Sequence, residues 1–250
     1  MIQGKADIYL LGSGIKSIYH ITLETRSILS SCKELYYYHD LPSLEEYFRS
    51  IHPEPVNLLE RFYIDGMDRG EIYSSTVTFI IERAMANSGI AFITHGHPLV
   101  GSTISQLLIE AAGKNGLSLE ILSAVSCFDS IVTDLRIDPI QNGLMIIEAS
   151  DLVGYSEPMN PYIDCILMQI ADIGSPVASR KKEHGADRLS ELKAFLLRYY
   201  PSDHQVSIIE SSVEVGFSGE IRTVALRKLD GISFTLLYNH SLYIPALPRR

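Results

Sequence analysis

The first half of the chain alternates short apolar runs with segments in which apolar residues recur at helical spacing. The apolar runs are typical of buried strands, and they cover residues 7–11, 34–38, 90–94 and 119–122. The segments with helical spacing predict helices over residues 21–32, 68–86 and 102–112. Residues 41–57 mix charge, proline and aromatics and predict a short helix and a loop. This order of strands and helices favours a mostly parallel sheet.

Two of these helices have recognisable beginnings. Thr22 is a suitable N-cap, and Asp68 with Glu71 three residues later fits a capping box. The second of these helices carries apolar residues along one stripe, namely Tyr73, Val77, Ile80, Ile81 and Ala84.

The second half is richer in strands. The pattern predicts strands at residues 143–148, 206–211, 222–226 and 234–238, a strand or mixed segment at 161–173, a helix at 190–199 and a loop at 151–161. Because the pattern changes near Ser123, we expect two α/β domains, residues 1–122 and residues 123–250.

Composition and charge restrict the function. The chain has 250 residues, 46% of them hydrophobic and 20% charged, which is typical of a soluble globular protein. A net charge of −9 argues against nucleic acid and against an anionic membrane as partners. The three cysteines form no C-x-x-C pair, and the first residues are too polar for a signal peptide. We therefore expect a cytoplasmic protein without a disulfide framework or a structural zinc site.

A glycine pair follows the first predicted strand. Gly12 and Gly14 have the spacing of a phosphate-binding turn, but Ser17 stands where the dinucleotide pattern needs its third glycine. No acidic residue stands clearly at the end of the next strand. The residues alone therefore favour a tight turn between strand and helix.

A second loop, residues 95–98 with the sequence His-Gly-His-Pro, follows the strand at 90–94. Ligands of α/β sheets bind beyond the carboxyl ends of strands, which favours a ligand loop over ordinary surface polarity. A metal site would need a third ligand, and no Cys/His cluster supplies one, so no metal is expected.

Tyr63, Arg69 and Tyr73 surround the helix start at residue 68. Arg69 and Tyr73 are four residues apart, so a helix presents both on one face. From these residues alone the structural interpretation is favoured: Tyr73 packs in the core and Arg69 pairs with Asp65 or Asp68. Neither a nucleophile elbow nor a P-loop occurs, so hydrolase and P-loop functions are not indicated.

Taken in order, several segments resemble the tetrapyrrole methylase family of S-adenosylmethionine-dependent methyltransferases. They are residues 8–14 followed by 21–24, residues 94–98, and residues 124–126 leading to Asp134. The 94–98 segment resembles the family's G-D-P loop with His97 in place of the aspartate. This substitution is similar to the borosin peptide backbone α-N-methyltransferases. Further segments similar to these enzymes are Ser126 with residues 133–139, Gln169 within 166–170, and residues 241–245.

The resemblance implies a two-domain α/β fold of tetrapyrrole methylase type, with the cofactor in the cleft between the domains. It implies S-adenosylmethionine as cofactor, S-adenosylhomocysteine as product, and a homodimer. The residues that it assigns to cofactor binding are Gly12, Gly14, His95, Gly96, His97, Pro98, Val100, Gly101, Ser126 and Gln169.

The resemblance also assigns Tyr63, Arg69 and Tyr73 to the acceptor amide as catalytic residues. The chain departs from the borosin enzymes at Glu60, where they carry a further tyrosine. Single-chain borosin enzymes carry their substrate peptide as a C-terminal extension, whereas this sequence ends at Arg250. We therefore expect a separate precursor peptide as substrate, with a heterotetramer of enzyme and peptide protein as one form of the complex.

The chemistry of amide methylation accounts for these residue types. An amide nitrogen is a poor nucleophile because its lone pair is delocalised into the carbonyl. An arginine and a tyrosine hydroxyl stabilise charge on the amide oxygen, and a second tyrosine takes the proton. We assign the base or its relay to Tyr63 and stabilisation to Arg69 and Tyr73, roles that the three residues could exchange.

Two other functions stay open. One is a methyltransferase for a tetrapyrrole or another small molecule; the other is a cofactor-binding regulatory module without catalysis. A porphyrinoid carries several carboxylates, and 21 basic against 30 acidic residues do not indicate a site for it.

Overall fold

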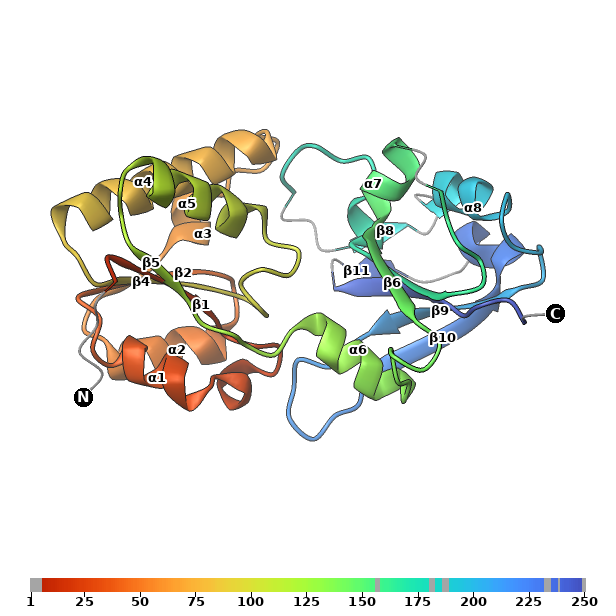
Figure 1. Ribbon diagram of the computed structural model, residues 1–250, viewed down its shortest axis with the longest axis horizontal. Helices are drawn as coiled ribbons and strands as arrows, with labels where there is room; N and C mark the ends of the chain where they lie inside the picture. Colours follow the sequence, from red (N-terminus) through yellow and green to blue (C-terminus); the bar gives the residue numbers. More distant parts are fainter. Residues whose placement is uncertain are drawn as a thin grey trace. The chain divides into compact units, whose positions relative to one another are not determined.

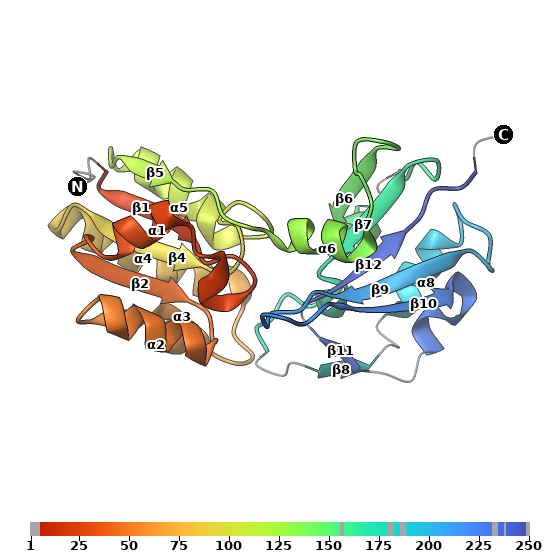
Figure 2. The same cartoon turned by 90° about the horizontal axis from the view of Figure 1, so that it is seen from below.

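A computed structural model describes residues 6–155, 158–179, 183–185, 189–231, 235–237 and 239–248 (Figures 1 and 2). The chain forms two compact units. Unit 1 comprises Met1–Ser130 and Val213–Phe217, and unit 2 comprises Ile131–Ser212 and Ser218–Arg250. We expected the boundary after residue 122, but residues 123–130 also belong to unit 1. One contact that joins this segment to unit 1 is that of Ala124 with the glycine turn, since a Cβ added to Gly12 would lie 2.7 Å from Cβ of Ala124.

Unit 1 contains a five-stranded sheet in the order β3-β2-β4-β1-β5. Every neighbouring pair is parallel, which confirms the prediction of a mostly parallel sheet. The strands are β1 (Ile8–Gly12), β2 (Glu34–Tyr38), β3 (Pro55–Asn57), β4 (Ile90–Thr94) and β5 (Leu119–Ile121). Strands β1 and β4 are buried along their whole length, as the apolar runs predicted.

Helices cover both faces of this sheet (Figure 1). They are η1 (Ser17–His20), α1 (Leu23–Leu29), α2 (Pro42–Ile51), α3 (Leu58–Phe62), α4 (Arg69–Ala86) and α5 (Thr103–Lys114). One apolar cluster joins the sheet to α4 and α5, and a second joins it to α1 and α2. The predicted helix starts are confirmed, because Thr22 accepts from the Thr25 amide and Asp68 accepts from the Glu71 amide.

Unit 2 contains a five-stranded sheet in the order β10-β9-β12-β7-β6 and a small β11-β8 pair. Strands β6 and β7 are parallel, and the other pairs are antiparallel. The strands are β6 (Leu144–Glu148), β7 (Asp164–Met168), β8 (Glu183–Gly185), β9 (Gln205–Glu210), β10 (Glu220–Ala225), β11 (Thr235–Leu237) and β12 (His240–Ile244). The helices are α7 (Ala149–Gly154), η2 (Ile170–Asp172), α8 (Ser190–Leu196) and η4 (Leu226–Gly231), and α6 (Cys127–Leu135) joins the two units.

The structure differs from the sequence pattern in several places in unit 2, where β8 and η4 were also not predicted. The loop expected at residues 151–161 begins inside α7, and its residues 156 and 157 lie outside the described part of the chain. Strand β12 was not predicted, although it lies between β7 and β9. Phe234 and Tyr238, at the ends of the strand expected over 234–238, and the terminal Arg249 and Arg250 also lie outside the described residues.

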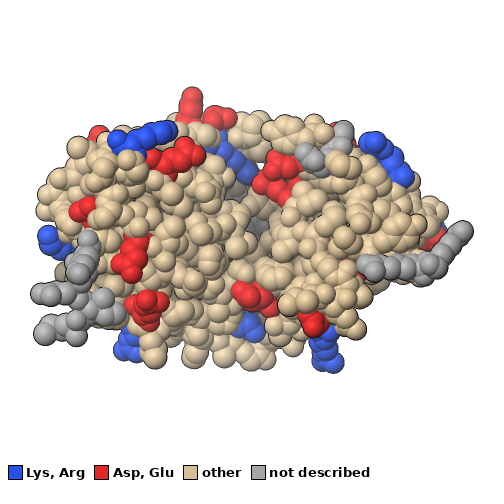
Figure 3. All heavy atoms as spheres, in the orientation of Figure 1, with Lys and Arg blue, Asp and Glu red and all other residues tan. Residues whose placement is uncertain are grey.

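The surface carries charges of both signs. Figure 3 shows Asp and Glu side chains scattered over one face, with Lys and Arg side chains between them and not gathered into a basic patch. Among the described residues, no helix combines the length and the apolar character that crossing a membrane requires.

Candidate functional site

The order of strands in unit 1 defines where a ligand can bind. Strands β1 and β4 are neighbours, but the chain leaves β1 towards β2 and leaves β4 towards β5, in opposite directions across the sheet. Helices α1 and α5, which make these two connections, therefore lie on opposite faces (Figure 1). Such a topological switch point opens a crevice at the carboxyl ends of its two strands. The two predicted ligand loops, residues 12–14 and 95–101, begin at these two ends.

The glycine turn at residues 12–14 is joined to the loop after β4. Gly14 and Gly96 exchange two backbone hydrogen bonds of 3.2 and 3.0 Å. A Cβ atom on Gly12 would lie 2.2 Å from the Gly96 carbonyl oxygen and 2.8 Å from Cδ of Pro98, so a side chain cannot fit. The structure thus brings four of the predicted cofactor residues together at the switch point.

The same hydrogen bonds decide between the two interpretations of the glycine turn. The Ser13 amide donates to the Thr94 carbonyl and the Gly14 amide to Gly96, so neither points at a ligand. Gly14 has φ +70°, and a Cβ there would lie 2.2 Å from Cβ of His20. The turn is tight, as the residues alone favoured, and the assignment of Gly12 and Gly14 to cofactor binding stays a prediction.

Residues 95–101, called the 95–101 loop below, are shaped by glycines and by His97. Gly96 and Gly101 have φ values of +72° and +64°, a region that favours glycine. Nδ1 of His97 accepts from the Leu99 amide at 3.1 Å, and the His97 carbonyl accepts from the Val100 amide at 3.1 Å. The His97 ring is half-buried, and Leu99 and Val100 expose apolar side chains. This loop offers a polar ring and apolar surface to a ligand.

Ser126, after β5, is buried and bonded to Asp129. Its amide and its hydroxyl both donate to Oδ2 of Asp129 at 2.7 Å, and its Oγ accepts from the Asp129 amide at 3.3 Å. This arrangement fixes the start of α6 and holds the residue at the carboxyl side of β5. In unit 1, Ser126 therefore has a structural function already.

The three predicted acceptor residues lie at one end of the helix pair α3 and α4. Tyr63 is the C-cap of α3, which directly follows β3, and Arg69 is the first residue of α4. Helix α4 ends before the amino end of β4, so its first turn lies at the carboxyl edge of the sheet, where the 95–101 loop also begins. Arg69 and Tyr73 are half-buried, and Tyr73 packs against the α4–α5 cluster. The topology thus places Tyr63 and Arg69 at the ligand-binding edge, while Tyr73 also packs as the structural interpretation expected.

Gln169 is the one predicted cofactor residue that belongs to unit 2. It follows β7 directly and has φ 57° and ψ 38°, the left-handed region that a residue with a side chain rarely adopts. A conformation of this kind costs about 1 kcal/mol or more and marks a position that its surroundings hold firmly.

Sequence reasoning missed His39, which directly follows β2. The side chain is 6% exposed, and burial lowers the pKa of its imidazole to about 3. Burial also lowers the pKa of His95. Only the pairing of β2 with β4, which the sequence pattern does not reveal, places the two histidines side by side.

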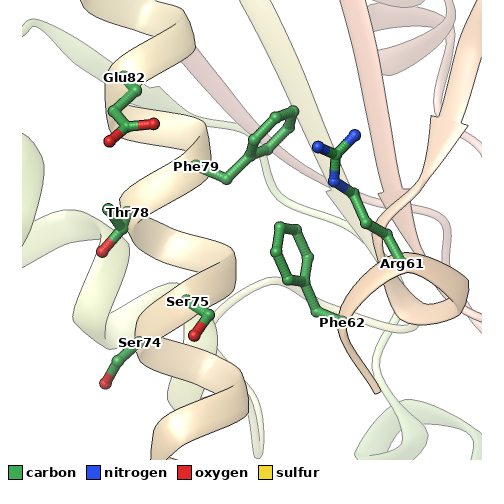
Figure 4. A pocket seen from close by; sticks show the side chains of 7 residues that line it. All are labelled: Arg61, Phe62, Ser74, Ser75, Thr78, Phe79 and Glu82. Carbon is green, nitrogen blue, oxygen red and sulfur yellow. The ribbon is translucent and has the colours of Figure 1, made fainter. Parts of the chain in front are cut away.

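A separate cavity of about 410 Å³ lies between α3 and the outward side of α4 (Figure 4). The Arg61 guanidinium lies 4.5 Å from the ring centroid of Phe79 and 5.5 Å from that of Phe62. Ser74, Thr78 and Glu82 line the helix side. This cavity contains none of the predicted site residues.

Comparison with known proteins assigns the family. The family model for tetrapyrrole (corrin/porphyrin) methylases matches residues 7–220. The chain belongs to the tetrapyrrole methylase family. The resemblance seen in the sequence is therefore confirmed, and with it the expectation of a methyltransferase domain.

One curated relative shows which kind of methyltransferase the sequence is similar to. This tetrapyrrole methylase is 29% identical over 165 residues to a Gymnopilus junonius protein described as a methyltransferase and ribosomally synthesized type I borosin cyclic peptide precursor. The match covers 66% of this chain and 39% of that protein, so the chain spans about two fifths of that relative's length.

Solved structures confirm the fold. A uroporphyrin-III-C-methyltransferase from Thermus thermophilus superposes with a TM-score of 0.65 and 17% identity, covering 95% of this chain and 93% of its own. A structure of the Thermus thermophilus enzyme complexed with S-adenosyl homocysteine gives a TM-score of 0.64 and 12% identity, covering 95% of this chain and 91% of its own. The predicted two-sheet α/β fold of tetrapyrrole methylase type is confirmed.

Proposed function

We propose that this tetrapyrrole methylase transfers methyl groups from S-adenosylmethionine to backbone amide nitrogens of a separate precursor peptide, as a borosin-type enzyme. The proposal is supported by the topology, which puts the end of α3 at Tyr63, the start of α4 at Arg69 and the start of the 95–101 loop at the carboxyl edge of one sheet. The borosin description of the Gymnopilus junonius relative supports the peptide as acceptor.

The residues at the switch point fit this cofactor. S-adenosylmethionine supplies an activated methyl group on a sulfonium cation. The 95–101 loop offers the half-buried His97 ring and the apolar Val100 side chain, which suit a ligand with an aromatic base and an aliphatic part. Burial lowers the pKa of His95 and the Asp40 carboxylate partly opposes this shift, so a negative charge lies within electrostatic reach of this loop. A cationic ligand is favoured there over a polyanionic one.

The three acceptor residues provide the charge stabilisation and the base that methylation of an amide nitrogen needs. Arg69 and Tyr73 share one face of α4 at spacing i and i+4, from which a guanidinium and a phenol hydroxyl stabilise charge on the amide oxygen. Tyr63, at the end of α3, would take the amide proton as its ionised phenolate or through water. The N–C bond to the methyl group would form as the C–S bond of the sulfonium breaks, with S-adenosylhomocysteine as the leaving group, and the protein contributes chiefly by holding acceptor and donor in line.

The assembly follows from the same proposal. We propose that the chain acts as a homodimer on a separate precursor peptide, and that it forms a heterotetramer when the precursor protein is attached. Light scattering of the chain alone and of the chain with its peptide tests both states.

Mass spectrometry of candidate precursor peptides incubated with the chain and S-adenosylmethionine tests the function. We expect successive increments of one methylene mass, located on backbone nitrogens by fragmentation. Arg69→Ala abolishes them, whereas Arg49→Ala, on the exposed side of α2, leaves them unchanged. Transfer to a tetrapyrrole but to no peptide would overturn the proposal, and binding of S-adenosylhomocysteine without any transfer would identify a non-catalytic module instead.

A further inference from the structure

A buried histidine, His39, and a half-buried one, His95, follow two neighbouring strands at the carboxyl edge of the unit 1 sheet, within electrostatic reach of each other. Strands β2 and β4 pair in parallel with Tyr38 opposite Thr94, and the next residue on each strand is a histidine, His39 or His95. In parallel strands, residues in register project their side chains to the same face. His95 begins the 95–101 loop, whereas His39 belongs to no part of the site described above.

Each ring has a buried nitrogen that needs a hydrogen-bond partner. Nδ1 of His39 accepts from the Leu41 amide at 3.5 Å, so the proton of the neutral ring is on Nε2. That Nε2 is buried and has no hydrogen-bond partner among the described residues. Nδ1 of His95 is likewise buried without a partner in the described part of the chain. Native structures leave few buried polar atoms unsatisfied, so two on adjacent residues indicate a shared partner.

We propose that one buried water accepts from Nε2 of His39 and donates to Nδ1 of His95, and that His39 thereby positions the 95–101 loop. A site between a donor and an acceptor suits a water, which makes both kinds of hydrogen bond. The inference deepens the proposed function, since it rests on this loop as the part that receives the cofactor.

The surroundings of His39 hold its ring rigidly enough for this task. The ring centroid lies 5.1 Å from that of Tyr37 and 5.6 Å from that of Phe48, and the His39 carbonyl accepts from Nδ2 of Asn57 at 3.1 Å. The loop is therefore tied to β2 and α2 in addition to its bonds with the glycine turn.

Burial favours the neutral form of both rings. Burial is the main cause that lowers the pKa of His39, and a positive charge on His95 would lower this pKa further. The Asp40 carboxylate acts in the opposite direction. The pKa of His95 is lowered by burial, again against Asp40. A neutral pair keeps one donor and one acceptor at all physiological pH values, and it places no positive charge beneath a loop proposed to bind a sulfonium cation.

Amide hydrogen exchange of the cofactor-free protein tests the positioning of the loop. His39→Phe keeps an aromatic ring but removes the donor, and we expect the Gly96 and Leu99 amides to exchange about tenfold faster. The Leu122 amide, which donates to the Leu10 carbonyl of β1, is the internal control, and we expect its exchange rate to stay unchanged. His39→Gln retains an amide donor and restores protection to within about threefold of wild type. Unchanged Gly96 and Leu99 rates in His39→Phe would overturn the inference, as would a uniform acceleration that includes Leu122.

Long-range ¹H–¹⁵N correlation spectra provide the second measurement. We expect His39 as the Nε2–H tautomer, with the Nδ1 resonance of His95 shifting in His39→Phe but not in His39→Gln. A His95 resonance that does not respond to His39→Phe contradicts the bridge. Because both measurements use protein without cofactor, their failure is distinguishable from failure of the proposed function, which would appear as absent binding of S-adenosylhomocysteine.

Discussion

Gly12→Ala is the substitution with the sharpest structural prediction. The new Cβ atom would lie 2.2 Å from the Gly96 carbonyl oxygen, 2.7 Å from Cβ of Ala124 and 2.8 Å from Cδ of Pro98. These atoms belong to backbone or to short, rigid side chains, so none can rotate away. The Gly96 backbone must move by about 1 Å to reach an ordinary contact distance.

The magnitude follows from what that movement breaks. Gly14 and Gly96 exchange two hydrogen bonds, each of which stabilises the fold by about 1 kcal/mol net. Overpacking of a filled site costs about 1–3 kcal/mol in addition. We therefore expect Gly12→Ala to lower the free energy of unfolding by roughly 3–5 kcal/mol and to abolish binding of S-adenosylhomocysteine.

Urea denaturation followed by circular dichroism measures the first effect, and calorimetric titration measures the second. Gly113→Ala is the matched control, because this glycine lies in α5 and its added Cβ would meet none of the described atoms within 4 Å. There we expect stabilisation by about 0.5–1 kcal/mol, the helix propensity difference. If Gly12→Ala instead matched wild type in stability and binding, the close approach of the two loops would be refuted.

Three further substitutions or treatments have expected outcomes. Tyr63→Phe lowers the single-turnover methylation rate by about 10²–10³, whereas Tyr19→Phe, at a 70% exposed position, leaves it unchanged; equal rates for both would remove Tyr63 from the reaction. Hydrogen bonds from its arginine partner lower the pKa of Glu34 from 4.5 to about 2, so wild type exceeds Glu34→Gln in stability by about 1–2 kcal/mol at neutral pH. This stability difference shrinks as the pH falls from about 4.5 towards 2. Urea denaturation of both proteins at pH 7 and pH 3 measures it, and an equal difference at the two pH values would contradict the reasoning. Burial raises the pKa of Cys165 to about 12, so a thiol reagent at pH 8 labels this residue slowly in the native protein and fast after unfolding, and rapid native labelling of Cys165 would refute its burial.

Local patterns predicted most elements of unit 1, because these strands and helices are set by neighbouring residues, but they missed β3 and α3. The run at residues 90–94 is buried on both faces, and the Asp68 and Glu71 pair marks the start of α4 without any tertiary information. Strand β12 was missed because its stability comes from pairing with β7 and β9, which are distant in sequence. Helix α7 was missed because the proline-rich segment after it dominates the local signal.

The site could be predicted only in part for a related reason. The loops at residues 12–14 and 95–98 follow strands, so their position at a ligand-binding edge follows from the α/β pattern alone. The acceptor residues Tyr63 and Arg69 needed the family resemblance, since their spacing equally suits a structural helix start. His39 needed the strand order, because only the β2–β4 pairing brings it beside His95.

Fragment mass spectra of a candidate precursor peptide, after incubation with the chain and isotopically labelled S-adenosylmethionine, test the central claim most directly. We expect labelled methyl groups on backbone nitrogens of consecutive residues, with none formed by Arg69→Ala. Label found on side chains only, or no label on any peptide while a small-molecule acceptor is methylated, would contradict peptide backbone methylation at the switch-point edge.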